Sequence, residues 1–388
     1  MSQSAKKLEK EYLKLLKKHG LLKQLRPFDL LDRPRIIQAL MTLITESKGS
    51  TAEQGDKPLA LSQDFIEDFI NVGGSEQRIL NSTAEKIRIG VETAGFSMPM
   101  EVFVGDFPTS SFNAQACRVR GGALLLINRG LTDLIWHIAK IFSISINVVY
   151  RSKDQTIPTH TVKASTFSEE QTTIALAEVV LAYLLRGSPH AVRPLPEQGK
   201  FRTAIVTFLM EACARFAVAH EFGHVIDGHL NSAKSILAET AVRKIELVKK
   251  DWWQEFMADQ IAVQIMMASL NKFDSKEGRK TLIIDGENRS EFEFLIAAPL
   301  VFLAIDKMVN RIYLELHDLR DVVIITDHPP SDARMGAILQ AYQGLGINSD
   351  QIPQWVDALM EWLFTKEESA AQVVRQLIYS VFHSRANE

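Results

Sequence analysis

The chain has 388 residues, 46% of them hydrophobic, and a formal net charge of −3 at pH 7. A chain of this length can bury a substantial core, and its charge gives no overall basic field that would attract nucleic acid. The two cysteines, Cys117 and Cys213, form no CxxC pair, which argues against a disulfide framework and against cysteine ligands to zinc.

The lysines near the N-terminus are not followed by an apolar segment, so a secretory signal is not expected. The longest uninterrupted apolar run, Phe294 to Ile305, is well short of the roughly 20 residues that span a bilayer. We therefore expect a soluble, cytoplasmic protein without a membrane span.

In chain order, residues 5–18 place leucines among lysines and glutamates in the amphipathic pattern of a helix. We expect the lysines to form a solvated face, with membrane or partner contact as the alternative. Residues 48–58 are polar and contain two glycines, which is typical of a linker. Further helices in this part of the chain are predicted at 34–45, 62–72 and 83–94.

The pattern becomes extended after Gly95. One strand is predicted at 101–104 and one or two more at 116–128, where Gly121 and Gly122 mark a turn. Because the rest of the chain carries no comparable signal, we expect one small antiparallel sheet.

Helical patterns return at 132–142 and 168–185, and the proline-containing residues 188–199 predict a loop. The loop leads into a long helix over 201–226 that no proline interrupts. This helix contains His-Glu-Phe-Gly-His at 220–224, which matches the pattern HExxH.

Residues four positions apart share a helix face, so His220 and His224 can present two imidazoles to one metal ion. Glu221 lies at the edge of the same face, where a carboxylate can take a proton from water at the metal. This arrangement suits zinc and predicts a zinc peptidase. The alternative, two buried histidines with ordinary hydrogen bonds, is disfavoured because nothing breaks the helical spacing.

A zinc peptidase needs a third protein ligand. The metzincin pattern HExxHxxGxxH is not met, since Gly228 and His229 each miss the required position by one residue. His229 is expected to be a hydrogen-bonding or surface residue. Glu255 and Asp259, four residues apart in a second apolar helix, are better candidates, one to bind zinc and the other to orient a ligand histidine.

Together these motifs resemble the HtpX and CAAX-prenyl-protease type of gluzincin metallopeptidase, in which HExxH is followed by an EFxAD segment. Glu255, Phe256, Ala258 and Asp259 match that segment here. The resemblance covers about residues 80 to 342 and includes further similar segments, in the family's order, at 98–104, 112–114, 126–131 and 327–330, followed by Arg334.

The resemblance implies that Glu255 is the third zinc ligand and that Asp259 supports a ligand histidine from behind. It makes His328 the first candidate to stabilise the oxyanion of the transition state, with Arg334 the second. For His328 the alternative is a rigid turn formed with the two prolines that follow it.

Strand Ala123 to Ile127 is expected to be an edge of the sheet beside the cleft, where an extended substrate adds as an antiparallel strand. Leu124 and Leu126 would then line the substrate. Asn113 and Ala114 would contact its backbone, although an Asx turn is the alternative for Asn113.

We therefore expect an α+β, mainly α-helical fold with a zincin-like core, a small antiparallel sheet and added helices. The predicted parts are an N-terminal helical extension and linker at 1–57, a catalytic domain at 58–345 and a C-terminal helical part at 346–388. The last part is predicted to contain two helices, at 350–364 and 366–382. A helical insertion at about 140–199 would either reach the cleft or form an extra packing layer.

The predicted function is a zinc-dependent endopeptidase, with one Zn²⁺, that cleaves a protein or peptide substrate and uses Glu221 as general base. The alternative is a non-catalytic, zinc-stabilised helical interaction module. A nucleic-acid-associated regulator ranks last, because no basic stripe with interleaved aromatic residues is found.

Overall fold

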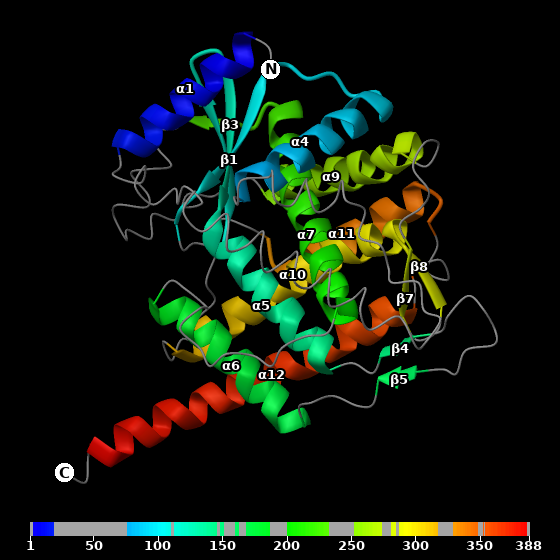
Figure 1. Ribbon diagram of the computed structural model, residues 1–388. Coiled ribbons are helices and arrows are strands. Elements are labelled where there is room, and N and C mark those ends of the chain that lie inside the picture. The colour runs from blue at the N-terminus through cyan, green and yellow to red at the C-terminus, as the bar shows by residue number, and fades with distance from the viewer. Residues whose placement is uncertain are drawn as a thin grey trace, which may run out of the picture.

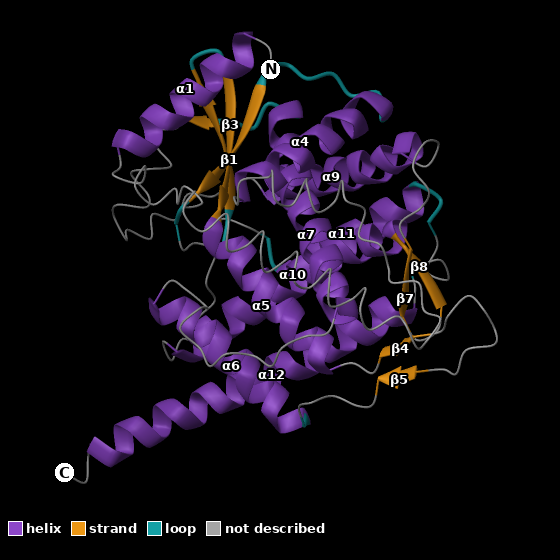
Figure 2. Cartoon of the chain, viewed as in Figure 1, coloured by secondary structure: helices purple, strands orange, loops and turns teal. Residues whose placement is uncertain are grey.

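The computed structural model shows a mainly helical protein with a small sheet at one end, which confirms the predicted helical content (Figures 1 and 2). The predicted helices at 34–45 and 62–72 and the linker at 48–58 lie outside the described residues. The structure describes residues 3–18, 76–109, 112–145, 148–150, 160–162, 168–186, 200–232, 252–273, 281–284, 287–316, 329–347, 352 and 354–385.

The elements follow one another as helices interrupted by short strands. The helices are α1 (Gln3–Lys18), α4 (Glu76–Thr93), α5 (Arg129–Ser145), α6 (Glu169–Arg186), α7 (Lys200–Ile226), α9 (Trp252–Phe273), α10 (Glu291–Leu316), α11 (Ser331–Gly344) and α12 (Gln354–Arg385). The strands are β1 (Val102–Phe107), β2 (Ala114–Val119), β3 (Gly122–Asn128), β4 (Val148–Tyr150), β5 (His160–Val162), β6 (Asn231–Ser232), β7 (Thr281–Ile284) and β8 (Glu287–Ser290).

The main sheet has the strand order β1-β3-β2-β6. β2 and β3 form the predicted hairpin, in which Gly121 adopts a left-handed φ of 102° that glycine tolerates without strain. β3 lies between β1 and β2 and runs parallel to β1, with Val102 opposite Ala123. The prediction of an antiparallel sheet is wrong, because within this main sheet the β2-β3 hairpin is antiparallel whereas the β1-β3 and β2-β6 pairs are parallel.

Two small antiparallel pairs, β4-β5 and β7-β8, add sheet structure that the sequence pattern missed. Each of these strands has only three or four residues. Such short strands contain too few alternations of apolar and polar residues to produce a recognisable pattern.

β3 is buried on both faces, so all seven of its residues are buried. Its side chains alternate in direction, and Leu124 and Leu126 pack against Leu8 and Leu16 of α1 on the outer face. The other β3 side chains, such as Leu125, join the main core, on the face that α4 and α7 cover (Figure 1).

The helix α1 is closely fitted to the sheet. Tyr12 is buried there, its hydroxyl donates a hydrogen bond to the carbonyl of Asp106, and its ring lies over Gly105. A Cβ on Gly105 would come within 2.5 Å of that ring, so the close approach requires glycine. The amphipathic pattern at 5–18 is therefore a helix whose apolar side is covered by the sheet.

The helices α5, α7, α9 and α10 form the body of the protein, with α7 in contact with each of the other three (Figure 1). Helix α6, from the predicted insertion at 140–199, packs against α5, α10 and α12. The C-terminal residues 354–385 form one continuous helix, so the predicted break near residue 365 is wrong. Among the described helices, none is both long and apolar enough to cross a membrane.

Candidate metal centre

The helix α7 carries His220 and His224 on one face, as their spacing predicts. Both side chains are buried, and their Nε2 atoms lie 3.2 Å apart. The helix is continuous over Lys200–Ile226, so the two imidazoles are held on a rigid element.

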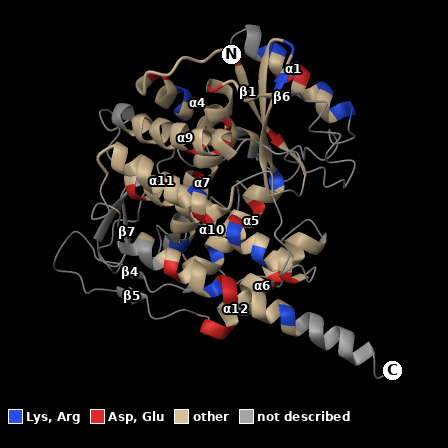
Figure 3. Cartoon of the chain, turned by 180° about the vertical axis from the view of Figure 1, so that it is seen from behind, with Lys and Arg blue, Asp and Glu red and all other residues tan. Residues whose placement is uncertain are grey.

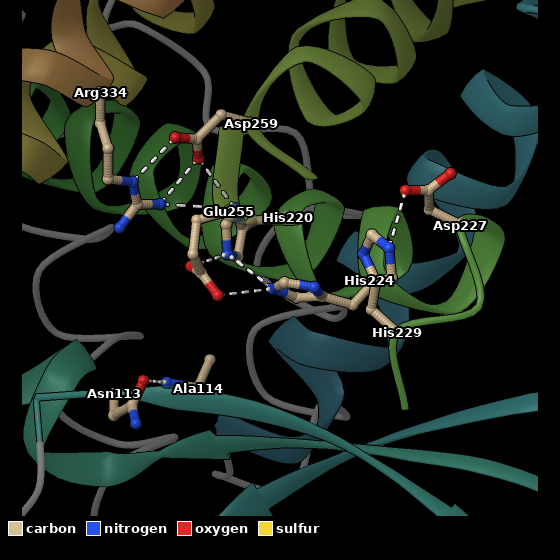
Figure 4. A network of polar contacts seen from close by, with 9 residues as sticks. All are labelled: Asn113, Ala114, His220, His224, Asp227, His229, Glu255, Asp259 and Arg334. Atoms are coloured by element: carbon tan, nitrogen blue, oxygen red, sulfur yellow. Dashed lines mark hydrogen bonds and ion pairs between the residues drawn. The ribbon is translucent and has the colours of Figure 1, made fainter. Parts of the chain in front are cut away.

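The helix α9 brings Glu255 to the same point (Figure 4). Its carboxylate oxygens lie 3.3 Å from Nε2 of His220 and 3.4 Å from Nε2 of His224. Ligand atoms bound tetrahedrally at about 2.0–2.1 Å from a metal ion are about 3.3–3.4 Å apart. The three side chains thus form a buried group that could hold a metal ion, and Glu255 is the third member that the sequence predicted.

The close approach of α7 and α9 depends on Gly223, inside the HExxH segment. A Cβ at this position would lie 2.8 Å from the Cα and from the carbonyl oxygen of Ala258. Since contacts of that length do not occur without a shift of the backbone, the pairing of glycine with alanine lets Glu255 reach the histidines.

Asp259 lies one turn after Glu255 and is fully buried behind His220. Nδ1 of His220 donates a hydrogen bond of 2.8 Å to Asp259, which leaves Nε2 of the ring toward Glu255. Arg334 of α11 donates from Nε at 2.8 Å and from Nη2 at 2.7 Å to the same carboxylate. The hydrogen bonds from Arg334 to Asp259 and from His220 to Asp259 therefore fix the orientation of the His220 imidazole.

These contacts set the charges of the group. Burial raises the pKa of Asp259, but the charge and hydrogen bonds of Arg334 lower it more, so the carboxylate remains ionised. Burial lowers the pKa of His220, yet Asp259 and Glu255 raise it to about 9 overall. The two carboxylates that raise this pKa give the site a negative electrostatic potential, which also favours a metal cation. Such a cation would compete with the proton for Nε2 of His220.

Arg334 does not have the place that its predicted catalytic role requires. Its guanidinium contacts Asp259, on the Nδ1 side of His220 and away from the Nε2 atom that faces Glu255. We therefore correct its assignment from an oxyanion donor to a residue that holds Asp259. The other predicted donor, His328, lies outside the described residues.

His229 is not part of the group. It follows Gly228, which ends α7 with a φ of 79°, and its Nε2 lies 3.0 Å from Asp227. Its ring is 6.1 Å from that of His224, and Figure 4 shows it on the side of that ring away from Glu255. This agrees with the prediction of a hydrogen-bonding residue.

Glu221 is buried beside His220 on α7. Its negative charge contributes, after burial, to raising the pKa of the Cys117 thiol, which reaches about 12. The Glu221 carboxylate is therefore close enough to Cys117 of β2 to interact with it electrostatically.

The predicted substrate-binding residues lie in two different places in the structure. Leu124 and Leu126 lie on an interior strand and pack under α1, so their assignment to a substrate edge is wrong. Ala114 begins β2 and Asn113 precedes it, and both lie across from Glu255 and the histidines (Figure 4). The Asn113 side chain accepts a 2.9 Å hydrogen bond from the amide of Ala114, so its contact is with the adjacent backbone.

The sequence interpretation overlooked Phe216, whose ring lies 6.1 Å from that of His220. Phe216 also makes an edge contact of 5.4 Å with Phe302 of α10, so an aromatic wall closes this side of the group. Its position four residues before His220 was the available signal, because that spacing places both on one helix face.

Comparison with models of known protein families, with characterised proteins and with solved structures finds no match to this chain. The functional interpretation therefore depends on the chain's own residues and their geometry.

Proposed function

We propose that the protein is a zinc-dependent peptidase that hydrolyses peptide bonds in a protein substrate. The observation that carries the proposal is the convergence of His220, His224 and Glu255 at separations of 3.2–3.4 Å. The buried Glu221 follows His220 directly in α7. Two imidazoles and a carboxylate are a usual ligand set for catalytic zinc, which leaves a fourth position for water. The motif order of the HtpX and CAAX-prenyl-protease type supports the same conclusion.

When bound, zinc supplies a Lewis acid that activates water and polarises the scissile carbonyl. Glu221 takes a proton from the attacking water and passes it to the departing amine. Asp259 keeps His220 in the tautomer that presents Nε2 to the ion, and Arg334 holds Asp259 in place.

The substrate edge is better assigned to β2 than to β3. β6 pairs with β2 only at Cys117 and Arg118, so Ala114 to Ala116 have no strand partner on that side within the described part of the chain. An extended peptide that adds there would pass in front of the group that Figure 4 shows.

The test combines metal analysis with one substitution. Purified protein is expected to hold one equivalent of zinc, and Glu221→Gln is expected to keep the zinc while losing at least about 100-fold in peptidase activity. Cleavage by Glu221→Gln at the wild-type rate would refute the general-base assignment. Substrate capture by the same variant in cells would identify the polypeptide.

A non-catalytic metal module is the second candidate, and the burial of the whole group favours it, since Glu255 and Asp259 have no exposed surface. The two candidates differ in the fourth ligand position. Cobalt-substituted protein would change its visible spectrum when a hydroxamate is added if that position is open to exchange, whereas a closed structural site would leave the spectrum unchanged.

A further inference from the structure

The outer side of α1 is a continuous basic surface. We define the lysine face as Lys6, Lys7, Lys10, Lys14, Lys17 and Lys18, which are all exposed. The helix contains these six lysines and two glutamates, a net charge of +4 in a chain whose total is −3. Figure 3 shows this basic character along α1 at the outside of the molecule.

The lysines are directed away from the protein because the opposite side of α1 is occupied. Leu8, Tyr12 and Leu16, at four-residue spacing, are buried against the sheet. Within the described part of the chain, Lys14 is the one lysine of this face with an ion pair, at 2.7 Å from Glu11. The surface is thus a fixed array of charges on a helix that the sheet holds in place.

The β2–β3 turn extends the array. The side chain of Lys7 lies within 4 Å of the position that a Cβ on Gly121 would take, and Arg120, which precedes this glycine, is exposed. The hydrogen bond with Lys14, followed by the charges of Lys14, Arg120 and Lys7, holds the pKa of Glu11 below its usual value. The turn and the helix therefore present one basic surface.

The chemistry of the array favours a lipid surface over nucleic acid. Surfaces that bind single-stranded nucleic acid combine basic residues with exposed aromatic rings for base stacking, whereas the one aromatic ring of α1, Tyr12, is buried. Clusters of four to eight lysines or arginines on an amphipathic helix are typical of binding to anionic phospholipids. Leu13, 41% exposed at the edge of the lysine face, offers a shallow apolar contact with such a surface.

We propose that the lysine face docks the protein on a membrane surface that carries anionic phospholipids. The apolar side of α1 is already buried against the sheet, so the helix stays on the protein and does not insert into the bilayer. Binding is therefore peripheral and electrostatic, and it does not depend on the proposed peptidase activity.

The proposal is tested by sedimentation of the full-length protein with vesicles of phosphatidylcholine alone or with about one-third phosphatidylserine. Binding is expected only with phosphatidylserine, and it is expected to be lost at about 0.5 M salt, where surface charges are screened. Equal binding to both vesicles, or no binding to either at low salt, would overturn the proposal. Retention on duplex DNA without vesicle binding would overturn it in favour of nucleic acid.

A pair of matched variants locates the surface. Lys6→Gln with Lys10→Gln removes two charges from the lysine face and, at about fivefold per lysine, should weaken partitioning about 25-fold. Lys307→Gln with Arg311→Gln removes the same charge from α10 and should leave partitioning unchanged. Glutamine preserves helix propensity, and circular dichroism checks that both variants are folded. Equal partitioning of the two variants would show that α1 is not the docking surface.

Discussion

Replacing Asp259 by Asn removes the charge that both Arg334 and His220 contact, with almost no change in side-chain size. Both partners of the Arg334–Asp259 pair are buried, and their shortest contact is 2.7 Å. Loss of one partner from such a pair costs about 3–5 kcal/mol, because the other charge is left uncompensated. Loss of the residue that orients a ligand histidine weakens metal binding about 10–100-fold.

Two measurements separate these effects. Urea unfolding of metal-free Asp259→Asn reports the loss of stability, and zinc competition with a chelator reports the affinity of the folded variant. The control is Asp332→Asn on α11, which breaks a 3.0 Å contact with Lys307 at the surface and should cost at most about 1 kcal/mol without affecting zinc. Wild-type zinc affinity in folded Asp259→Asn would refute the orienting role.

Further predictions concern helix packing and pH. Gly223→Ala should lower the free energy of unfolding by about 1–3 kcal/mol and weaken zinc binding, because the added methyl group meets Ala258. The control is Gly336→Ala on α11, where nothing lies within 4 Å of the added methyl group, and it should cause neither loss in the same urea and zinc-competition assays. The pKa of His220 is about 9 when folded and about 6.5 when unfolded, so its stabilising contribution to the metal-free protein is complete below pH 6.5 and lost as pH rises through 9. Over the same range zinc affinity should increase, since the ligand must be deprotonated; a pH-independent affinity in titrations would contradict the geometry.

The local motifs could be predicted from sequence because each depends on residues close together in the chain. The spacing of His220 and His224 sets their common helix face, and Gly121 marks the hairpin turn. The same is true of α1, whose buried leucines and exposed lysines follow the helical period. In each case local geometry alone is enough.

The sheet was predicted less well because strand order is a long-range property. Nothing in the residues of β3 indicates whether it is an edge or an interior strand, apart from its nearly continuous apolar character. That character, with Leu124 and Leu126 both apolar, was the signal that β3 is covered on two sides. The prediction that β3 is an edge strand was therefore wrong.

The sequence by itself determined that His220, Glu221 and His224 lie close together on one helix. It also determined that two carboxylates, those of Glu255 and Asp259, follow on a second helix. Only the tertiary structure decided that Glu255 reaches both imidazoles, that Asp259 lies behind His220, and that Arg334 supports Asp259. The physical reason is that these relations depend on the approach of α7 to α9 and of α9 to α11, across sequence separations of 31 to 75 residues. Helical periodicity sets the direction of a side chain, but the packing of the helices sets what it meets.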